Sequence, residues 1–130
     1  GIHTDSSDPA LTNVVFTGNR AGNAGGAMNN YNGATPVLTN VSISGNSANF
    51  GGAIRNNISC NTVIINTILW GNSAATNGNE LYNNASTPVI SYSIIEGSGG
   101  SGAVSWSSFT PYPWDDPACP PQRDRVCPGP

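Results

Sequence analysis

The chain has 130 residues, enough for a single domain, and only 8% of them are charged. Its formal net charge is −3 and its basic side chains are all Arg, so we expect no nucleic-acid partner, because phosphate binding needs a basic face. No stretch approaches the roughly 18 consecutive apolar residues of a membrane span.

One segment recurs four times along the chain. Its copies begin at Pro9, Pro36, Thr62 and Pro88, which gives a period of 27, 26 and 26 residues. The copy at 36–48 reads PVLTNVSISGNSA, and the fourth copy is the most divergent. A period between about 20 and 50 residues is typical of a solenoid.

The repeat predicts strands rather than helices. It is rich in Val, Ile, Thr, Asn and Gly, and it lacks the period of about 3.6 residues that helical repeats show. Alternate positions are predicted to face inward, as in a strand with one buried face. The inward pairs are Val14 and Phe16, Val41 and Ile43, Thr67 and Leu69, and Ser93 and Ile95.

A second motif lies between these copies. Residues 25–30 read GGAMNN, residues 51–56 read GGAIRN, and 79–83 are a looser version. Residues 1–4 fall in register with 27–30, so the sequence opens inside a repeat, and we expect either a removed upstream part or an open face that meets a partner. Stacking predicts two inner columns: Ile2, Met28, Ile54 and Leu81, and Phe16, Ile43, Leu69 and Ile95.

Asn residues stand where the alternation breaks within each copy. Asn tolerates left-handed backbone angles, so it suits a sharp bend between two strands. Stacked once per coil, Asn13, Asn40 and Asn66 are expected to hydrogen-bond along the axis as a buried ladder. Asn19, Asn46 and Asn72 form a second expected column.

These patterns predict an all-β chain, a right-handed parallel β-helix of about four coils with three short strands and three bends per coil. The repeat resembles the Gly-Gly-Ala-Ile-x-Asn type found in many secreted and surface-anchored bacterial proteins, within the pectate-lyase-like superfamily. The resemblance covers residues 1–97 and implies the fold. Activities in that superfamily range from lyases and hydrolases to adhesins and purely structural segments.

The composition changes near residue 97. Residues 1–97 are predicted to form the β-helix, and 98–130 a Gly/Ser linker with a Pro- and aromatic-rich tail that packs on the β-helix, caps its last coil or binds a neighbouring subunit. Cys119 and Cys127 flank a Pro-rich loop and form a candidate disulfide, whereas Cys60 is expected to be a small buried side chain.

No catalytic, cofactor-binding or metal site is predicted. Glycoside hydrolysis needs two carboxylates at a set separation, and no such pair recurs in the repeats. Glu80 and Glu96 are scattered, and Arg20 and Arg55 occupy non-equivalent positions. His3 is the single His, and no Cys-x-x-Cys is present.

Three sequons occur, at Asn40, Asn57 and Asn84. Asn40 belongs to the first predicted ladder and should therefore be buried. Asn57 and Asn84 lie one repeat apart in bends expected to face solvent, so they are candidate N-glycosylation sites.

Apolar side chains are expected to face outward in the third coil. Ile65, Ile68 and Trp70 form a candidate interface, together with Trp106 and Trp114 of the tail. Exposed apolar patches often mark interfaces, and head-to-tail contacts that do not close into a ring make filaments.

The sequence therefore predicts a non-enzymatic structural protein, extracellular or at the cell surface, whose copies assemble head-to-tail into a fibre or filament. The alternative is a surface adhesin or carbohydrate-binding segment in which Trp70, Tyr31, Tyr82 and Trp114 stack on sugars. A lyase-like enzyme that lacks coils is the third hypothesis. The expected partners are other copies of the chain, or glycans.

Overall fold

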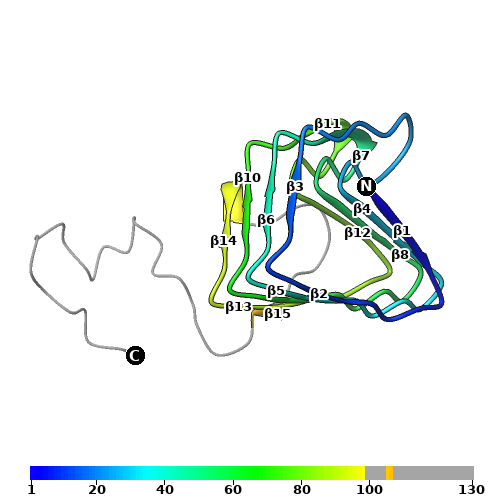
Figure 1. Ribbon diagram of the computed structural model, residues 1–130. Helices are drawn as coiled ribbons and strands as arrows, with labels where there is room; N and C mark the ends of the chain where they lie inside the picture. Colours follow the sequence, from blue (N-terminus) through cyan, green and yellow to red (C-terminus); the bar gives the residue numbers. More distant parts are fainter. Residues whose placement is uncertain (99–104, 107–130) are drawn as a thin grey trace, which may run out of the picture.

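The structure is a computed structural model that describes residues 1–98 and 105–106 of the chain. Within these residues, short strands wind into a parallel β-solenoid of about four coils, which lie one behind another in Figure 1. Equivalent strands pair at the spacing of the repeat, Ile2 with Met28 and Ala10 with Val37. The prediction of an all-β parallel solenoid is confirmed.

Equivalent strands form four sheets along the sides of the solenoid. Sheet A contains β1 (Ile2–Asp5), β4 (Met28–Tyr31), β8 (Ile54–Asn57) and β12 (Leu81–Asn84). Sheet B contains β2 (Ala10–Thr12), β5 (Val37–Thr39), β9 (Val63–Ile65), β13 (Val89–Ser91) and β15 (Ser105–Trp106). Sheet C contains β3 (Val15–Thr17), β6 (Ser42–Ser44), β10 (Ile68–Trp70) and β14 (Ile94–Ile95). Sheet D contains β7 (Ser47–Phe50) and β11 (Ser73–Asn77). The short 3₁₀ turn η1 (Glu96–Ser98) follows β14, and no helix within the described ranges is long and apolar enough to cross a membrane.

Four columns of residues with positive φ turn the chain from one sheet to the next. The corner from sheet B to sheet C uses Asn13, Asn40 and Asn66, with φ of 57°, 55° and 48°, as expected for Asn, and Tyr92 in the fourth coil. The remaining columns are Gly18, Gly45, Gly71 and Gly97; Gly25, Gly51 and Gly78; and Ser6, Asn32, Ile58 and Ala85. The expectation of three bends per coil is therefore too low by one, because Gly forms two of the four corners and the alternation of apolar residues does not reveal them.

Both predicted inner columns are present and are joined by a third. The register stacks Ile2 on Met28, Ile54 and Leu81, and Phe16 on Ile43, Leu69 and Ile95. Sheet B adds Leu11, Leu38, Ile64 and Ile90. These columns line the interior as one continuous hydrophobic core.

After the fourth strand of sheet B, the chain returns to this sheet in fewer residues than one repeat. Val89 pairs with Val63, 26 residues before it, but Ser105 pairs with Val89 after only 16 residues. Consequently β11 and β12 are the last strands of sheets D and A in the described part of the chain. Strand β15 also places two residues of the predicted 98–130 tail in the β-solenoid.

The Gly-Gly-Ala motif is required where sheet D turns into sheet A. A Cβ on Gly26 would lie 2.2 Å from the carbonyl oxygen of Gly52, and a Cβ on Gly52 would lie 2.4 Å from that of Asn79. Side chains do not approach a backbone this closely, so only Gly allows successive coils to stack at this corner.

We expect Gly52→Ala to lower the free energy of unfolding by about 1–3 kcal/mol or more, because the backbone of the next coil must move. Gly22→Ala is the matched control, since no atom lies within 4 Å of its added Cβ and its φ is not positive. It should change the free energy by no more than about 0.5 kcal/mol. Urea denaturation followed by circular dichroism measures both, and equal effects would contradict the close stacking.

Candidate functional site

Sheet C presents a cluster of exposed apolar side chains on its outer face. Ile68 and Ile94 are register partners on β10 and β14, Trp70 lies further along β10, and Tyr92 occupies the corner before β14. We call these four residues the apolar flank; their exposed fractions are 45% for Ile68, 56% for Ile94, 53% for Trp70 and 66% for Tyr92.

A shallow groove of about 340 Å³ borders the apolar flank. Ile68, Tyr92 and Ile94 line part of it, and Asn40 and Asn66 contribute side-chain amides. Among the residues that the structure describes, none that lines this groove is acidic or basic. The groove can therefore cover an apolar partner or hydrogen-bond to a neutral one, and its described lining offers no carboxylate or amine for acid–base chemistry.

The structure brings together part of the predicted interface. Ile68 and Trp70 face outward as predicted, whereas Ile65 is half-buried on β9 of sheet B and is not part of the flank. For Trp106 the structure describes the strand but not the side chain, and Trp114 lies outside the described residues. Ile94 is absent from the predictions, although its position one period after Ile68 identifies it.

The ladder of Asn13, Asn40 and Asn66 exists, but it is exposed rather than buried. Asn40 Nδ2 donates to Asn13 Oδ1 at 3.1 Å, and Asn66 Nδ2 donates to Asn40 Oδ1. The expectation of burial is wrong because these left-handed corner residues direct their side chains to solvent. In the fourth coil Tyr92 takes this position, so the ladder ends at Asn66 Oδ1, beside the groove.

The predicted column of Asn19, Asn46 and Asn72 is a ladder inside the wall of the solenoid. Asn46 is 1% exposed and Asn72 is 5% exposed. In both Asn19 and Asn46, the backbone N–H and Nδ2 donate to Oδ1 of the next Asn, all at 2.9 Å. Each bond between successive Asn side chains in this ladder therefore runs from the earlier coil to the later one, while Nδ2 of Asn46 and of Asn72 also donates back to the carbonyl oxygens of Phe16 and Ile43.

A third ladder, inside sheet A, is absent from the sequence predictions. Thr4 Oγ1 donates to Asn30 Oδ1 at 2.7 Å, and Asn30 Nδ2 donates to Asn56 Oδ1 at 2.8 Å. Asn56 Nδ2 in turn donates to Asn83 Oδ1 at 2.8 Å, and all four side chains are buried. The signal for this ladder is the position of each Asn two residues after an inner-column residue, which points it inward in a strand.

The two candidate glycosylation sites differ in accessibility. Asn57 is only 5% exposed, so the expectation that it faces solvent is wrong. Its Oδ1 accepts a hydrogen bond from Asn84 Nδ2 at 2.6 Å, which holds the side chain against the next coil. Asn84 and Asn40 are the sequon residues that the fold leaves exposed.

Glu80 ends the ladder of Asn19, Asn46 and Asn72. It stands at the Ala position of the Gly-Gly-Ala motif and is 1% exposed. Its Oε1 accepts from the Asn72 backbone N–H at 3.0 Å, and its Oε2 accepts from Asn72 Nδ2. Burial raises the pKa of Glu80 and the nearby Glu96 carboxyl raises it further, whereas the bonds from Asn72 lower it.

The fold thus brings together two carboxyls that are scattered in the sequence. Glu96 is half-buried and its Oε2 accepts from the Gly71 backbone N–H at 2.6 Å. Glycoside hydrolysis requires both carboxyls to flank the substrate bond, and Glu80 is too deeply buried to contact a substrate. The sequence signal for this pair is an acid at a position that is Ala in the earlier coils.

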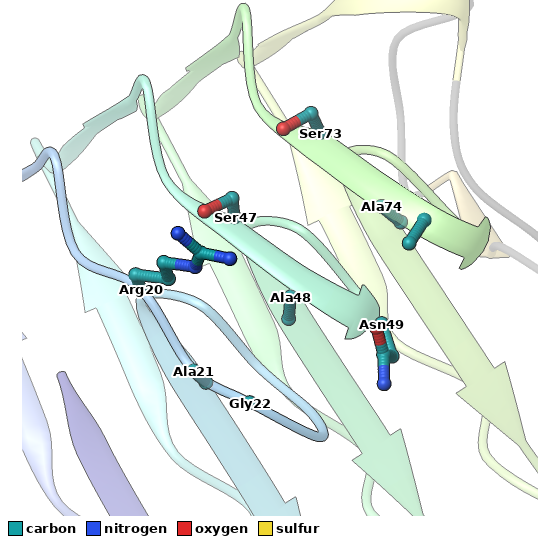
Figure 2. A pocket seen from close by; sticks show the side chains of 9 residues that line it. Arg20, Ala21, Gly22, Ser47, Ala48, Asn49, Ser73 and Ala74 are labelled. Atoms are coloured by element: carbon teal, nitrogen blue, oxygen red, sulfur yellow. The ribbon is translucent and has the colours of Figure 1, made fainter.

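A second shallow groove, of about 280 Å³, runs along sheet D (Figure 2). Arg20 extends over it from the first coil toward Ser47, and small side chains line much of the rest. Arg55 lies on β8 of sheet A, with Nη1 3.4 Å from Asn29 Oδ1. A single guanidinium attracts an anion, but within the described part of the chain no residue lining this groove is a carboxylate that would complete an acid–base pair.

The remaining candidate ligands have structural contacts. Within the described residues, no three His, Cys, Asp or Glu side chains are grouped to hold a metal ion. Asp8 Oδ1 accepts from Thr35 N at 2.6 Å and Thr35 Oγ1 at 2.8 Å, and these bonds lower the pKa of Asp8. Cys60 is buried, as expected, and the candidate disulfide of Cys119 and Cys127 lies outside the described residues.

Comparison of the chain with family models, curated proteins and solved structures finds no match in any of the three. The fold is accordingly assigned as a parallel β-solenoid, without a superfamily.

The two predicted ladders should differ in their contribution to stability. Asn46→Ala removes the acceptor of both Asn19 donors, and an unsatisfied buried group costs about 1–3 kcal/mol, so we expect a loss of about 2–4 kcal/mol. Asn40→Gly removes an exposed amide without straining the left-handed corner, so its loss should stay below about 1 kcal/mol. Thermal and urea denaturation compare the two variants, and a larger loss for Asn40→Gly would contradict the burial.

Glu80→Gln should remove a pH dependence of stability. Because the pKa of Glu80 is raised above its ordinary 4.5 in the folded chain, folding favours the protonated carboxyl. That contribution is complete below the pKa of the unfolded chain and is lost as the pH rises through the folded pKa. We therefore expect the unfolding free energy of the wild type to fall as the pH rises from about 4, and that of Glu80→Gln to fall less.

The lowered pKa of Asp8 has the opposite sign, and its contribution is lost only as the pH falls below about 4. The two effects therefore occupy separate pH ranges. Urea denaturation at a series of pH values measures the slope, and identical slopes in the wild type and Glu80→Gln would rule out Glu80 as its source.

Proposed function

We propose that this chain is a non-enzymatic structural β-solenoid of the extracellular space or the cell surface, whose copies associate through the apolar flank. The observation that carries the proposal is the gathering of Ile68, Trp70, Tyr92 and Ile94 on one side of the solenoid, each between 45% and 66% exposed. Contiguous exposed apolar patches mark interaction sites, and burying one large apolar side chain contributes about 1.5–3 kcal/mol.

The earlier coils support a specific role for this patch. On the outer face of sheet C, the second coil carries Ser42 and Ser44 at the positions of Ile68 and Trp70. The repeat itself therefore does not require apolar side chains at these outward positions. Apart from Val15, the exposed apolar side chains of sheet C gather in the third and fourth coils.

The polar interior supports a scaffold rather than an enzyme. The inward amides of two ladders bond to their equivalents in the next coil, which leaves few polar groups inside the solenoid for a substrate. Glu80, with 1% exposure, is held by Asn72 and does not reach the surface. A sparsely charged chain with a hydrogen-bonded interior fits a rigid structural element.

The assembly that we propose is head-to-tail stacking into a fibre or filament. Strands at the end of one copy would pair with strands of the next copy, and the apolar flank would pack against the neighbouring copy. The Gly-Gly-Ala-Ile-x-Asn resemblance, and with it the pectate-lyase-like superfamily, supports an extracellular setting. The exposed sequon at Asn84 and the candidate disulfide of Cys119 and Cys127 fit the same setting.

Carbohydrate binding is the second candidate, and Tyr92 is the residue that favours it. Tyr92 is 66% exposed and lines the groove, and Asn66, the last residue of the exposed Asn ladder, lines it too. An aromatic face and a hydrogen-bond acceptor therefore lie in the same groove. Tyr31 and Tyr82 are only half-exposed, and the ring centroid of Tyr82 lies 5.2 Å from that of Phe50. Retention of the untreated chain on immobilised neutral oligosaccharides would favour this reading.

Replacing both Ile68 and Ile94 by Ser should weaken self-association at least tenfold without loss of the fold, because two large apolar contacts worth about 1.5–3 kcal/mol each disappear. Ile58→Ser is the matched control, since Ile58 is 43% exposed but lies at a corner outside sheet C. Sedimentation velocity measures association, and circular dichroism checks the strands.

Electron microscopy of the untreated protein tests the form of the assembly. Ordered filaments that disappear in the Ile68 and Ile94 variant support the proposal. Dispersed single particles, or equal association of that variant and the Ile58→Ser control, would contradict it.

A further inference from the structure

Side chains cap the backbone where the third coil turns from sheet C to sheet D. Three of the four backbone amides from Gly71 to Ala74 donate to side chains, and the fourth, Ser73 N, donates to Asn46 O of the preceding coil. The bonds run from Gly71 N to Glu96 Oε2 at 2.6 Å, from Asn72 N to Glu80 Oε1 at 3.0 Å, and from Ala74 N to Asn79 Oδ1 at 2.9 Å.

These side chains replace the contacts of a further coil. In the first coil, Gly18 N donates to Ser44 O at 3.3 Å, and Ala21 N donates to Ser47 O at 2.9 Å. The third coil has no such neighbour in sheet D among the described residues, where β11 is the last strand. Open strand edges accept foreign strands, so a side-chain cap also closes this edge to other chains.

Two of the three capping groups are carboxyls that interact with each other. The Glu96 carboxyl raises the pKa of Glu80 both through its charge and through a side-chain hydrogen bond. Of the described elements that contact Glu80, the corner at Asn72 contributes amide donors and η1 contributes the Glu96 carboxyl. Two carboxylates that share a buried site cannot both be charged without a large cost.

We propose that Glu80 and Glu96 share one proton and that this proton closes the corner as a latch. In the closed form, the Glu80 carboxyl donates its O–H to one oxygen of the Glu96 carboxylate, and Glu80 still accepts both bonds from Asn72. The other oxygen of Glu96 accepts the Gly71 N–H. When the proton leaves to water at higher pH, the adjacent charges repel, and Glu96, the more exposed of the two, turns to solvent and releases Gly71.

The latch joins the strands that carry the apolar flank. Gly71 directly follows Trp70 at the end of β10, and Glu96 directly follows β14, which carries Ile94. Opening would free an edge for a strand of a second copy and would loosen the flank. This consequence for assembly rests on the proposed function, whereas the latch itself does not.

Amide hydrogen exchange of the full chain tests the latch. The measured quantity is the protection factor, the exchange rate of each amide relative to its rate in an unfolded chain at the same pH. Between about pH 5 and 9 we expect the protection of Gly71 to fall by up to tenfold per pH unit above the midpoint, the slope of a single proton. Ala74, whose acceptor is the neutral amide of Asn79, is the internal control and should keep its protection.

Two variants separate the latch from general loosening. Glu80→Gln keeps an acceptor for Asn72 and offers a permanent N–H to Glu96, so Gly71 should stay protected at every pH. Glu96→Ala removes the acceptor of Gly71, so its protection should be low throughout. A pH-independent Gly71 in the wild type, parallel loss at Gly71 and Ala74, or an unchanged titration in Glu80→Gln would each overturn the latch.

Sedimentation velocity of the same samples tests the link to assembly. We expect association to change at the pH where Gly71 loses protection, and to become independent of pH in Glu80→Gln. If Gly71 titrates while the sedimenting mass does not change, the latch stands and its role in the proposed assembly is wrong.

Discussion

Register between coils is the constraint on which the rest of this structure depends. Strands pair with their equivalents one repeat away, so every inward side chain meets a near-copy of itself about 4.8 Å along the axis. Apolar side chains satisfy this constraint by packing. A buried polar side chain satisfies it only if the same group both donates and accepts, which the carboxamide of Asn does. The ladders through Asn46 and Asn56 are direct results of that requirement.

Outward positions are free of this constraint, and there the coils differ from one another. The position that carries Ser42 in the second coil carries Ile68 in the third and Ile94 in the fourth, with no change in the strand register. A surface for association can therefore be built on the solenoid without altering its core. The Asn ladder stops at Asn72, whose backbone N–H and side-chain amide donate to the Glu80 carboxyl instead of to another Asn. The titratable group is therefore part of the same hydrogen-bond network as the ladder.

The period was sufficient to predict the parallel pairing, the number of coils and the inner columns. Residues one repeat apart in the sequence lie next to each other along the axis, so the period gives their contacts directly. It could not predict which way a corner residue points. Asn40 and Asn46 both recur once per coil, yet Asn40 is exposed and Asn46 is buried, since only Asn40 has a positive φ at the corner. The interaction of Glu80 with Glu96 could not be predicted for another reason. The two residues occupy non-equivalent positions of the repeat, so the period does not bring them together.

The bonds between Asn side chains in the ladder through Asn46 have a direction, since in each of them the earlier coil donates and the later coil accepts. A ladder of this kind can be lengthened in its middle by whole coils without leaving any amide unpaired. It ends at Glu80, because both carboxyl oxygens accept bonds from Asn72 and the group has no N–H with which to continue the ladder. Glu at the position of one small inward residue is thus the stop signal of this ladder.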